Sequence, residues 1–315
     1  MTCVAITGAT GFIGRRFLTH LDGRNLRLRL HARHPLQLLD ATRGAAAAAQ
    51  VAGIEPPVVV GGDLHARSTW HELLDGADLA VHLAGAVRGR NPRDFAVNTG
   101  AVVALRDAAL AEPRLRIVLV SSLAARQPQL SAYAESKRAG ERLLQAEPGL
   151  DWTILRPPAV YGPGDRELAP LLNLWAKGFG VCPGDRAARM SLLHVDDLCG
   201  ALLATLRAPG ARGHVLEPDD GKAGGYAWRE VMEVVSNITG QPIRPLRLPR
   251  AVLELAGHLV VIASAVRGDA PMLTPGKVRE LTHRDWVSQG DVARRLLGWQ
   301  PAIDLRAGLT PLLLP

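Results

Sequence analysis

The stretch ITGATGFIGRR at residues 6–16 constrains the fold more than any other part of the chain. Gly8, Gly11 and Gly14 stand three residues apart, directly after the apolar run CVAI and directly before FLTHL. Where a strand leads into a helix, such glycines allow a tight turn and let a pyrophosphate approach the unpaired N–H groups of the helix N-terminus. The stretch therefore predicts a dinucleotide-binding turn rather than an empty structural one.

Five further apolar runs follow, each ending in a polar or glycine-bearing turn: LRLRLHAR, PPVVVGGDL, DLAVHLAG, RIVLVSSL and DWTILRPPAV. Helical patterns lie between them, as at Gly14–Leu21, Trp70–Leu74 and Phe95–Ala111. Strands that alternate with helices in this way are typical of a parallel sheet covered on both faces. The sequence therefore predicts the α/β class, with a Rossmann-type doubly wound parallel sheet.

After residue 160, proline and glycine become frequent and the alternation breaks up. We therefore expect an NAD(P)-binding domain at 1–160, with further core elements around 186–216. Residues 161–315 are then mainly a smaller substrate-binding region that interleaves with this core. The alanine-rich segment GAAAAAQVAG at 44–53 predicts only a surface helix or loop.

The composition excludes several classes of protein. A chain of 315 residues, 47% of them hydrophobic, can bury a large core and fits a globular protein. Its start lacks the charged region and long apolar core of a signal peptide, so we expect a cytoplasmic location. Cys3, Cys182 and Cys199 have no paired spacing, which predicts reduced structural thiols rather than disulfides or a metal site.

The net charge of +7 comes mainly from arginine. Four of the 37 basic residues are lysines, which leaves 33 arginines, scattered without a basic block. This is a weak signal for nucleic acid, so we predict no nucleic-acid partner. A basic surface that suits phosphorylated ligands or anionic lipid explains the charge equally well.

The end of the second strand bears on the choice of nucleotide. NAD sites usually place an acidic residue there to hold the ribose hydroxyls. This chain has Arg33 instead, and Arg15 and Arg16 face the same neighbourhood from the first helix. Because a guanidinium binds a 2′-phosphate and a carboxylate repels it, the pattern predicts NADP(H) in preference to NAD(H). Asp63, at the end of the next strand, either contacts the adenine or caps a turn.

A second group of residues points to proton transfer. In SAYAESKRAGE, Tyr133 and Lys137 are four residues apart and therefore share one helix face. A nearby ammonium favours the phenolate, so this tyrosine can exchange a proton with a carbinol or ketone oxygen. Eleven residues before Tyr133, Ser121 and Ser122 end a core strand, at the edge where such sheets bind ligands. The pattern predicts a Ser-Tyr-Lys catalytic site.

These residues resemble the extended short-chain dehydrogenase/reductases, also called the NAD(P)-dependent epimerase/dehydratase family, over nearly the whole chain. The resemblance runs through TGATGFIG, GDL, HLAG, VNTGAVVAL, VSSLAA, YAESK, LRPPAVYGPGD, HVDDL and LLGWQPAIDLRAGL. It implies that Tyr133 is the general acid or base and that Lys137 tunes it and holds the nicotinamide ribose. Ser122 would hydrogen-bond the substrate oxygen, with Ser121 as the alternative. Asn98 matches the asparagine that supports a water relay in relatives.

The same resemblance implies which residues contact the cofactor. They lie in the glycine turn, at the strand ends and at the Tyr-Lys pair: Gly8, Thr10, Gly11, Phe12, Ile13, Gly14, Arg15, Arg33, Asp63, Leu64, Leu83, Ala84, Gly85, Tyr133, Lys137, Pro157 and Val160.

Departures from the family pattern narrow the expected reaction. Sugar-nucleotide dehydratases of the family carry an Asp-Glu pair where this chain has Leu123 and Ala124. Many epimerases carry an asparagine that binds the diphosphate, and here that position is Ala159. Arg189 matches an arginine of the epimerases, but the acid usually beside it is replaced by Met190.

We therefore expect an NADPH-dependent oxidoreductase that reduces a ketone to an alcohol on a hydrophobic, lipid-like substrate. A long-chain 3-oxo base such as 3-oxo-sphinganine, an oxo-ceramide or a sterol-like ketone fits this expectation. A nucleotide-sugar epimerase or reductase is the alternative. A non-catalytic NADP-binding subunit is a second alternative, although such relatives tend to lose the tyrosine or the lysine.

The segment LPRAVLELAGHLVVIASAVR at 248–267 is strongly apolar. Pro249 suits the first turn of a helix and Gly268 its end. The segment contains Glu254 and His258 and is short for a bilayer span. It predicts a helix that covers the substrate pocket, lies on a membrane surface at the inner face, or simply packs against the protein. The following GDAPMLTPGKVREL resembles family members that act on steroid-like or long-chain lipid ketones.

Two further expectations concern HVDDL and oligomerisation. His194, Asp196 and Asp197 suggest a metal cluster only in isolation, and we expect them to fix a loop and cap a helix. Relatives commonly dimerise through the helix that carries Tyr133, so the resemblance implies a homodimer.

Overall fold

The computed structural model describes residues 1–33, 56–185, 187–268, 270–271 and 273–314. The alanine-rich segment at 44–53 lies outside these described residues.

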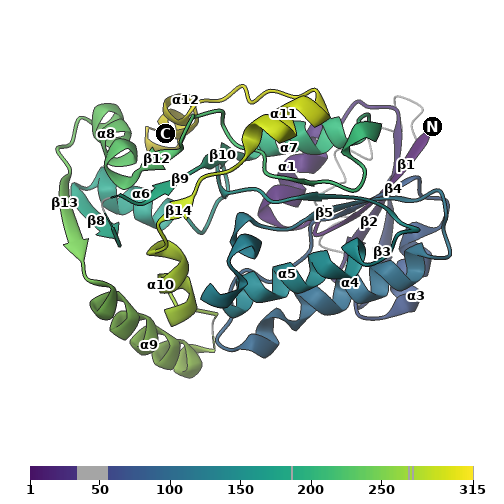
Figure 1. Cartoon of the computed structure of the whole chain (residues 1–315), viewed down its shortest axis with the longest axis horizontal. Coiled ribbons are helices and arrows are strands. Elements are labelled where there is room, and N and C mark those ends of the chain that lie inside the picture. Colours follow the sequence, from purple (N-terminus) through teal and green to yellow (C-terminus); the bar gives the residue numbers. More distant parts are fainter. Residues whose placement is uncertain (34–55, 186, 269, 272, 315) are drawn as a thin grey trace.

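A seven-stranded parallel sheet forms the centre of the protein (Figure 1). Its order is β11-β6-β5-β4-β1-β2-β3, and every neighbouring pair is parallel. The six apolar runs of the sequence form β1 (Thr2–Thr7), β2 (Leu26–Ala32), β3 (Val58–Gly61), β4 (Leu79–His82), β5 (Arg116–Val120) and β6 (Asp151–Leu155). The predicted doubly wound sheet is confirmed. The seventh strand, β11 (Val215–Leu216), is too short to show a period in the sequence.

Helices cover both faces of this sheet (Figure 1). One face carries α1 (Phe12–Leu21), α7 (Val195–Thr205) and α11 (Gly290–Leu297). The other carries α3 (Arg67–Leu74), α4 (Ala96–Ala109) and α5 (Ala132–Gln145). Side chains alternate between the two cores: Val4 and Ile6 pack on the first face and Ala5 on the second. The strand order reverses between β1 and β4, so a crevice for a ligand opens at their carboxyl ends.

Residues beyond β6 build a smaller part with its own core. Its strands pair as β7 (Ala159–Tyr161) with β10 (Leu192–His194), β8 (Phe179–Pro183) with β13 (Arg244–Leu248), and β9 (Arg189–Met190) with both β12 (Tyr226–Ala227) and β14 (Asp285–Trp286). Its helices are α6 (Ala169–Ala176), α8 (Trp228–Thr239), α9 (Arg250–Arg267), α10 (Pro275–Leu281) and α12 (Leu305–Leu313). The buried rings of Trp175 and Trp228 meet edge to face with centroids 5.9 Å apart. Because α7, β11 and α11 belong to the central sheet and its core, the chain passes back and forth between the two parts.

The HVDDL segment is structural, as expected. His194 caps α7, because its Nδ1 accepts the N–H of Asp196 at 3.3 Å. Asp197 accepts the N–H groups of Ala302 and Ile303 at 2.8 and 3.0 Å and thereby fixes the C-terminal loop. Among the described residues, no group of His, Cys, Asp and Glu has the arrangement of a metal site.

Two further features bear on the sequence expectations. The side chains of Cys3, Cys182 and Cys199 are buried, and no disulfide joins them within the described chain. No helix in the described ranges has the length and apolarity needed to cross a membrane.

Candidate active site

The glycine turn between β1 and α1 is compressed against neighbouring backbone. Gly8 has a φ of +72°, and a Cβ there would lie 2.7 Å from the backbone nitrogen of Ala84. A Cβ on Gly14 would lie 2.1 Å from the carbonyl oxygen of Gly8. Gly11 is exposed, and no side chain caps the helix it begins. Gly8 and Gly14 therefore let the backbone segments pack closely, while Gly11 leaves the N-terminus of α1 open to a phosphate.

Arg33 and Arg15 are both exposed, the first directly after β2 and the second in the first turn of α1. Arg16 does not join them, contrary to expectation. Its guanidinium forms a two-pronged ion pair with Asp196, with Nη2 to Oδ2 at 2.7 Å. This pair joins α1 to α7, so the guanidinium of Arg16 is engaged by a carboxylate rather than available to a phosphate.

Asp63 lies in the turn after β3. Its Oδ1 contacts the backbone N–H and the ring Nδ1 of His65 at 3.0 and 2.9 Å, so Asp63 caps a turn, and its contact with the adenine stays a prediction. The His65 hydrogen bonds hold the pKa of this exposed carboxyl below its usual range. The side chain of Leu64 is buried in the core, so only its backbone is available to a nucleotide.

The segment after β4 closes the other side of the crevice. Leu83, Ala84 and Gly85 follow this strand, and the N–H of Ala84 bonds to Thr7 Oγ1 at 3.2 Å. The same hydroxyl contacts His82 Nδ1 at 2.7 Å. Burial lowers the pKa of His82 to about 3, with the charge of Lys137 as a smaller cause, so this ring is neutral. The sequence did not single out Thr7 or His82, although each is a polar residue ending a buried strand.

The other predicted cofactor residues lie around this crevice. Thr10, Phe12 and Ile13 lie in the glycine turn and at the start of α1, with Thr10 exposed and the two apolar side chains half-buried. The carbonyl of Pro157 accepts the N–H of Leu123 at 2.9 Å, so the segment 157–160 runs beside the serine pair. Val160 is half-buried.

Lys137 lies under the segment that follows β4. It is only 9% exposed, and its Nζ donates to the carbonyl of Val120 at the end of β5, at 3.1 Å. A Cβ on Gly85 would lie 3.2 Å from this Nζ, so the backbone passes directly over the ammonium. Burial lowers the pKa of Lys137 to about 8, and the charge of Glu141 opposes this fall.

Tyr133 is half-buried in the first turn of α5 and packs against the ring of Phe95. Burial raises the pKa of Tyr133, and its hydrogen bond with Ser122 opposes this rise. The charge of Lys277 on α10 opposes it as well. The sequence did not single out Lys277 as a site residue, because it lies 144 positions beyond the tyrosine and shares no local pattern with it.

The two serines have different partners. Ser121 is buried, and its Oγ donates to Glu141 Oε1 at 2.6 Å. Ser122 is less buried and its Oγ accepts the N–H of Ala124 at 3.2 Å. Ser122 acts on the pKa of Tyr133, whereas Ser121 is engaged by Glu141, which favours Ser122 as the serine of the predicted site.

Asn98 is buried and ties the segment after β4 to α5. Its Oδ1 accepts the N–H of Ala86 at 2.7 Å, and its Nδ2 contacts the carbonyl of Ala86 and Ser136 Oγ, each at 2.9 Å. The amide thus positions two walls of the site. The water relay expected from the family pattern stays a prediction.

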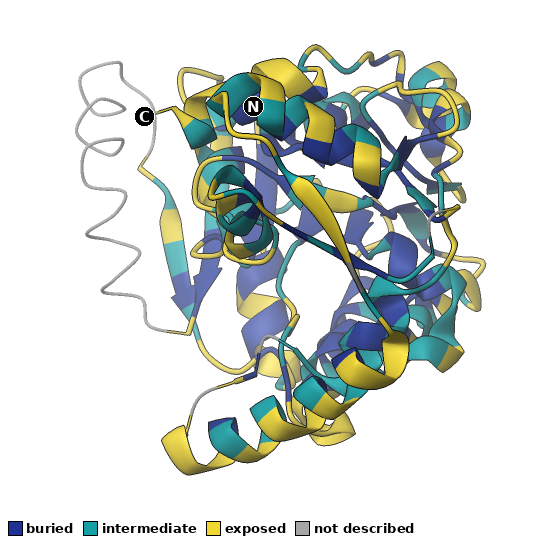
Figure 2. Cartoon of the chain, turned by 90° about the vertical axis from the view of Figure 1, so that its left-hand side faces the viewer, coloured by how far each residue is buried: buried dark blue, intermediate teal, exposed yellow. Residues whose placement is uncertain are grey.

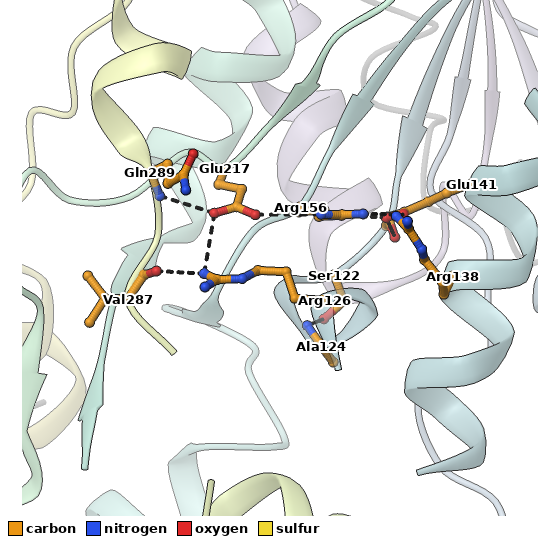
Figure 3. A network of polar contacts seen from close by, with 10 residues as sticks. Ser122, Ala124, Arg126, Arg138, Glu141, Arg156, Glu217, Val287 and Gln289 are labelled. Atoms are coloured by element: carbon orange, nitrogen blue, oxygen red, sulfur yellow. Dashed lines mark hydrogen bonds and ion pairs between the residues drawn. The ribbon is translucent and has the colours of Figure 1, made fainter. Parts of the chain in front are cut away.

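A buried charge network lies behind the serines (Figure 3). Arg156 at the end of β6 forms a two-pronged pair with Glu141 of α5, at 2.8 and 2.5 Å. Arg138 reaches the same carboxylate at 3.0 Å. Since Ser121 also bonds there, this network fixes α5 against the ends of β5 and β6.

The network continues to the C-terminal part through Glu217 (Figure 3). This carboxylate lies 3.7 Å from Arg156 and 3.6 Å from Arg126, and it accepts the N–H of Gln289 at 3.1 Å. Arg126 also donates to the carbonyl of Val287 at 2.7 Å. The segment at 287–289 is thereby held against the strand ends.

A cavity of about 210 Å³ opens beside Tyr133. Its walls come from the segment 87–92, Phe95, the start of α5, Glu167 and the region from Pro271 to Glu280. Phe95 and several prolines give apolar surface, but charged side chains are also present: Arg88, Arg90, Glu167, Lys277, Arg279 and Glu280. The lining is therefore mixed rather than simply apolar.

Four of the charged residues that line this cavity form two ion pairs. Arg88 pairs with Glu167 at 2.6 Å, and Lys277 pairs with Glu280 at 3.0 Å. Glu280 also accepts the hydroxyl of Ser131, which caps α5. No described residue of α9 lines the cavity, so α9 does not cover it.

Comparison with known proteins identifies relatives of this chain. The family described as NAD dependent epimerase/dehydratase matches residues 4–217. The chain is 37% identical to the ceramide reductase of Caulobacter vibrioides, over 90% of this chain and 85% of that protein. It is 27% identical to the 4-hydroxy-2-methyl-3-oxo-4-farnesyl-3,4-dihydroquinoline-1-oxide ketoreductase of Stigmatella aurantiaca, over 98% and 94% of the two chains.

Solved structures share the fold at lower identity. The dTDP-glucose 4,6-dehydratase of Bacillus anthracis, determined with NAD, superposes with a TM-score of 0.72 at 15% identity. The match covers 99% of this chain and 96% of that one. At this identity the likeness concerns the fold alone.

We expect the substitution Glu141→Gln to lower the free energy of unfolding by about 3–5 kcal/mol, because it removes the charge that balances the buried Arg156. Denaturant titration followed by circular dichroism measures this loss. Glu135→Gln, on an exposed position of the same helix, is the matched control and should change stability by less than about 0.5 kcal/mol. Equal stability of the two variants would contradict the role given to the network.

Proposed function

Since the chain belongs to the NAD-dependent epimerase/dehydratase family, we propose that it uses NADPH to reduce a ketone on a lipid-like molecule. The family makes it an NAD(P)-dependent oxidoreductase of the extended short-chain dehydrogenase/reductase type. One observation carries the proposal: Tyr133 lines a cavity, and Ser122 opposes the rise that burial causes in the pKa of this tyrosine.

The residues of the crevice fit a dinucleotide. Gly11 leaves the N-terminus of α1 open to the pyrophosphate, and Gly85 has no side chain that would fill the space beside Lys137. In the proposal, Lys137 holds the nicotinamide ribose. The cofactor supplies a hydride when it is bound.

Proton transfer falls to the protein. Burial keeps Tyr133 protonated at neutral pH, which suits a group that donates its proton to a carbonyl oxygen during reduction. Ser122 orients the same oxygen by a hydrogen bond. The ammonium of Lys137 stabilises the negative charge left on the tyrosine. Asn98 positions the helix that carries both residues.

The preference for NADPH rests on charge at the end of β2. Arg33 and Arg15 are exposed there, and Asp63 is engaged by His65. The exposed guanidinium groups of Arg15 and Arg33 favour the additional phosphate of NADPH.

The substrate class rests on the cavity and on two relatives. A ceramide reductase and a farnesyl-bearing quinoline oxide ketoreductase are carbonyl-reducing relatives whose names indicate long apolar chains. The charged groups of Lys277, Glu280 and Glu167 suit a polar head with hydroxyl or amide groups. A long-chain 3-oxo base or its N-acyl form combines these two features, whereas a sterol-like ketone offers fewer polar groups.

Two alternatives are less well supported by the site. A nucleotide-sugar enzyme lacks a diphosphate ligand at the exposed Ala159 and an acid-base pair at Leu123 and Ala124. A non-catalytic NADP-binding subunit would not require the tyrosine and the lysine of the family pattern, and this chain has both, Tyr133 and Lys137.

Three further expectations stay proposals. We place the boundary between the nucleotide and substrate regions near residue 160. We expect a homodimer formed through α5, the helix with Tyr133. We also expect the protein to act at the inner face of a membrane through residues 248–267.

Tyr133→Phe should lower kcat for ketone reduction by about 10²–10⁴-fold, because only the proton donor is lost. NADPH affinity, measured by fluorescence titration, should change less than about twofold because the aromatic ring remains. Tyr226→Phe is the control, since its hydroxyl bonds to Asp220 outside the site. Near-normal turnover by Tyr133→Phe would show that the proton donor is another group.

Arg33→Ala should weaken NADPH binding by roughly tenfold or more and leave NADH binding unchanged, since a single charged hydrogen bond to the 2′-phosphate is lost. Titration calorimetry with both cofactors measures the change. Arg27→Ala, at an exposed position near the other end of β2, is the control. Equal affinity of the wild-type protein for the two cofactors would rule out the proposed preference.

The substrate class is tested by following NADPH oxidation with 3-oxo bases and N-acyl 3-oxo bases of increasing chain length, and with UDP-, GDP- and dTDP-sugars. We expect turnover on the ketolipids, with KM falling as methylenes are added, by up to about fourfold for each one that becomes buried. Turnover confined to a sugar nucleotide would overturn the lipid assignment.

A further inference from the structure

The outer face of α9 carries large apolar side chains in contact with solvent. Val252, Leu255, Leu259, Ile262 and Val266 are 50%, 62%, 58%, 64% and 87% exposed. Their spacing of three and four residues places them on one side of the helix. We call these five residues the apolar stripe. An exposed apolar surface of this kind marks an interaction site.

The opposite side of α9 is anchored to the protein. Leu253, Gly257 and Ser264 are its buried residues. A Cβ on Gly257 would lie 3.1 Å from the backbone of Thr274, so α9 rests directly on the chain that begins α10. Figure 2 shows α9 along the lower edge of the molecule, with exposed bands on its outer side. The apolar stripe is therefore held outward by packing.

Two neighbouring strands add to the exposed apolar surface at this end of the molecule. β13 leads into α9 and pairs with β8 (Figures 1 and 2). Leu246 of β13 is 57% exposed and Phe179 of β8 is 64% exposed. These two side chains add exposed apolar surface to the strand pair that leads into α9.

The charge around the stripe indicates what covers it. The segment 241–268 contains four arginines, among them the exposed Arg244 and Arg250, and a single acid, Glu254. That acid is already paired with Arg250 at 2.8 Å. An apolar helix face bordered by arginines matches a bilayer surface with anionic headgroups, since the side chains enter the acyl boundary while the arginines meet phosphates.

We propose that α9 docks on an anionic lipid bilayer, lying in the plane of the surface with its apolar stripe inserted and its flanking arginines at the headgroups. The docked helix is followed by Thr274, which caps α10, and by Lys277 and Glu280 of α10, and all three line the cavity beside Tyr133. The membrane contact and the cavity are therefore joined by one short stretch of chain. Docking rests on the membrane contact proposed above for residues 248–267 and deepens it by naming the helix face and the charge of the lipid; it requires neither cofactor nor turnover.

Vesicle flotation of the full chain tests the proposal. Wild-type protein should float with vesicles of phosphatidylcholine and phosphatidylglycerol and much less with phosphatidylcholine alone, and high salt should weaken the binding. The double variant Leu255→Glu/Leu259→Glu should bind the anionic vesicles roughly tenfold less or weaker still. Leu110→Glu, at a position 52% exposed outside α9, is the matched control and should bind like wild type.

Two further measurements separate the possible explanations. Without vesicles, the double variant should reduce a short-chain, water-soluble ketone at the wild-type rate, which shows that the fold and site are intact. Light scattering after gel filtration should give the same mass for both proteins. Wild-type binding that ignores anionic lipid, or a double variant that binds as tightly as wild type, overturns the proposal. A dimer that the double variant splits overturns it in favour of a second copy of the chain.

Discussion

The carboxylate of Glu141 is completely buried, so its charge must be balanced within the protein. Arg156, Arg138 and Ser121 provide that balance from β6, from α5 itself and from the end of β5. Because a buried charge without these partners is costly, α5 has little freedom to rotate or slide on the sheet. Tyr133 and Lys137 project from this helix, and their positions relative to Ser122 depend on the same contacts.

Local patterns in the sequence predicted the six longer strands of the central sheet, the glycine turn and the shared helix face of Tyr133 and Lys137. They succeed because each depends on a repeat or spacing within a few residues. The contacts that sequence reasoning missed are between distant residues. Arg16 pairs with Asp196, 180 positions away, and Lys277 reaches the neighbourhood of Tyr133 from α10. Their partners are decided by how the chain folds back on the sheet, which no local period records.

The apolar segment at 248–267 shows the limit of composition as a guide to position. Its hydrophobicity is compatible with a pocket lid, with a packed helix and with a surface helix. In the structure only a narrow side of α9 is buried, and the cavity beside Tyr133 is lined instead by α10 and the segment 87–92. The cavity wall near the tyrosine thus carries charges such as Lys277 and Glu280, although the neighbouring sequence is strongly apolar.

The contacts of residues 287–303 have a consequence for the order in which the protein folds during synthesis. Glu217 accepts the N–H of Gln289, Arg126 donates to the carbonyl of Val287, and Asp197 accepts the N–H groups of Ala302 and Ile303. A nascent chain can complete the strands of the nucleotide half long before these residues are translated. At that stage Asp197 and Glu217 lack these C-terminal N–H partners, because residues 289–303 have not yet left the ribosome. The strand ends behind the serines therefore reach their final arrangement only after residues 287–303 have been synthesised and have left the tunnel.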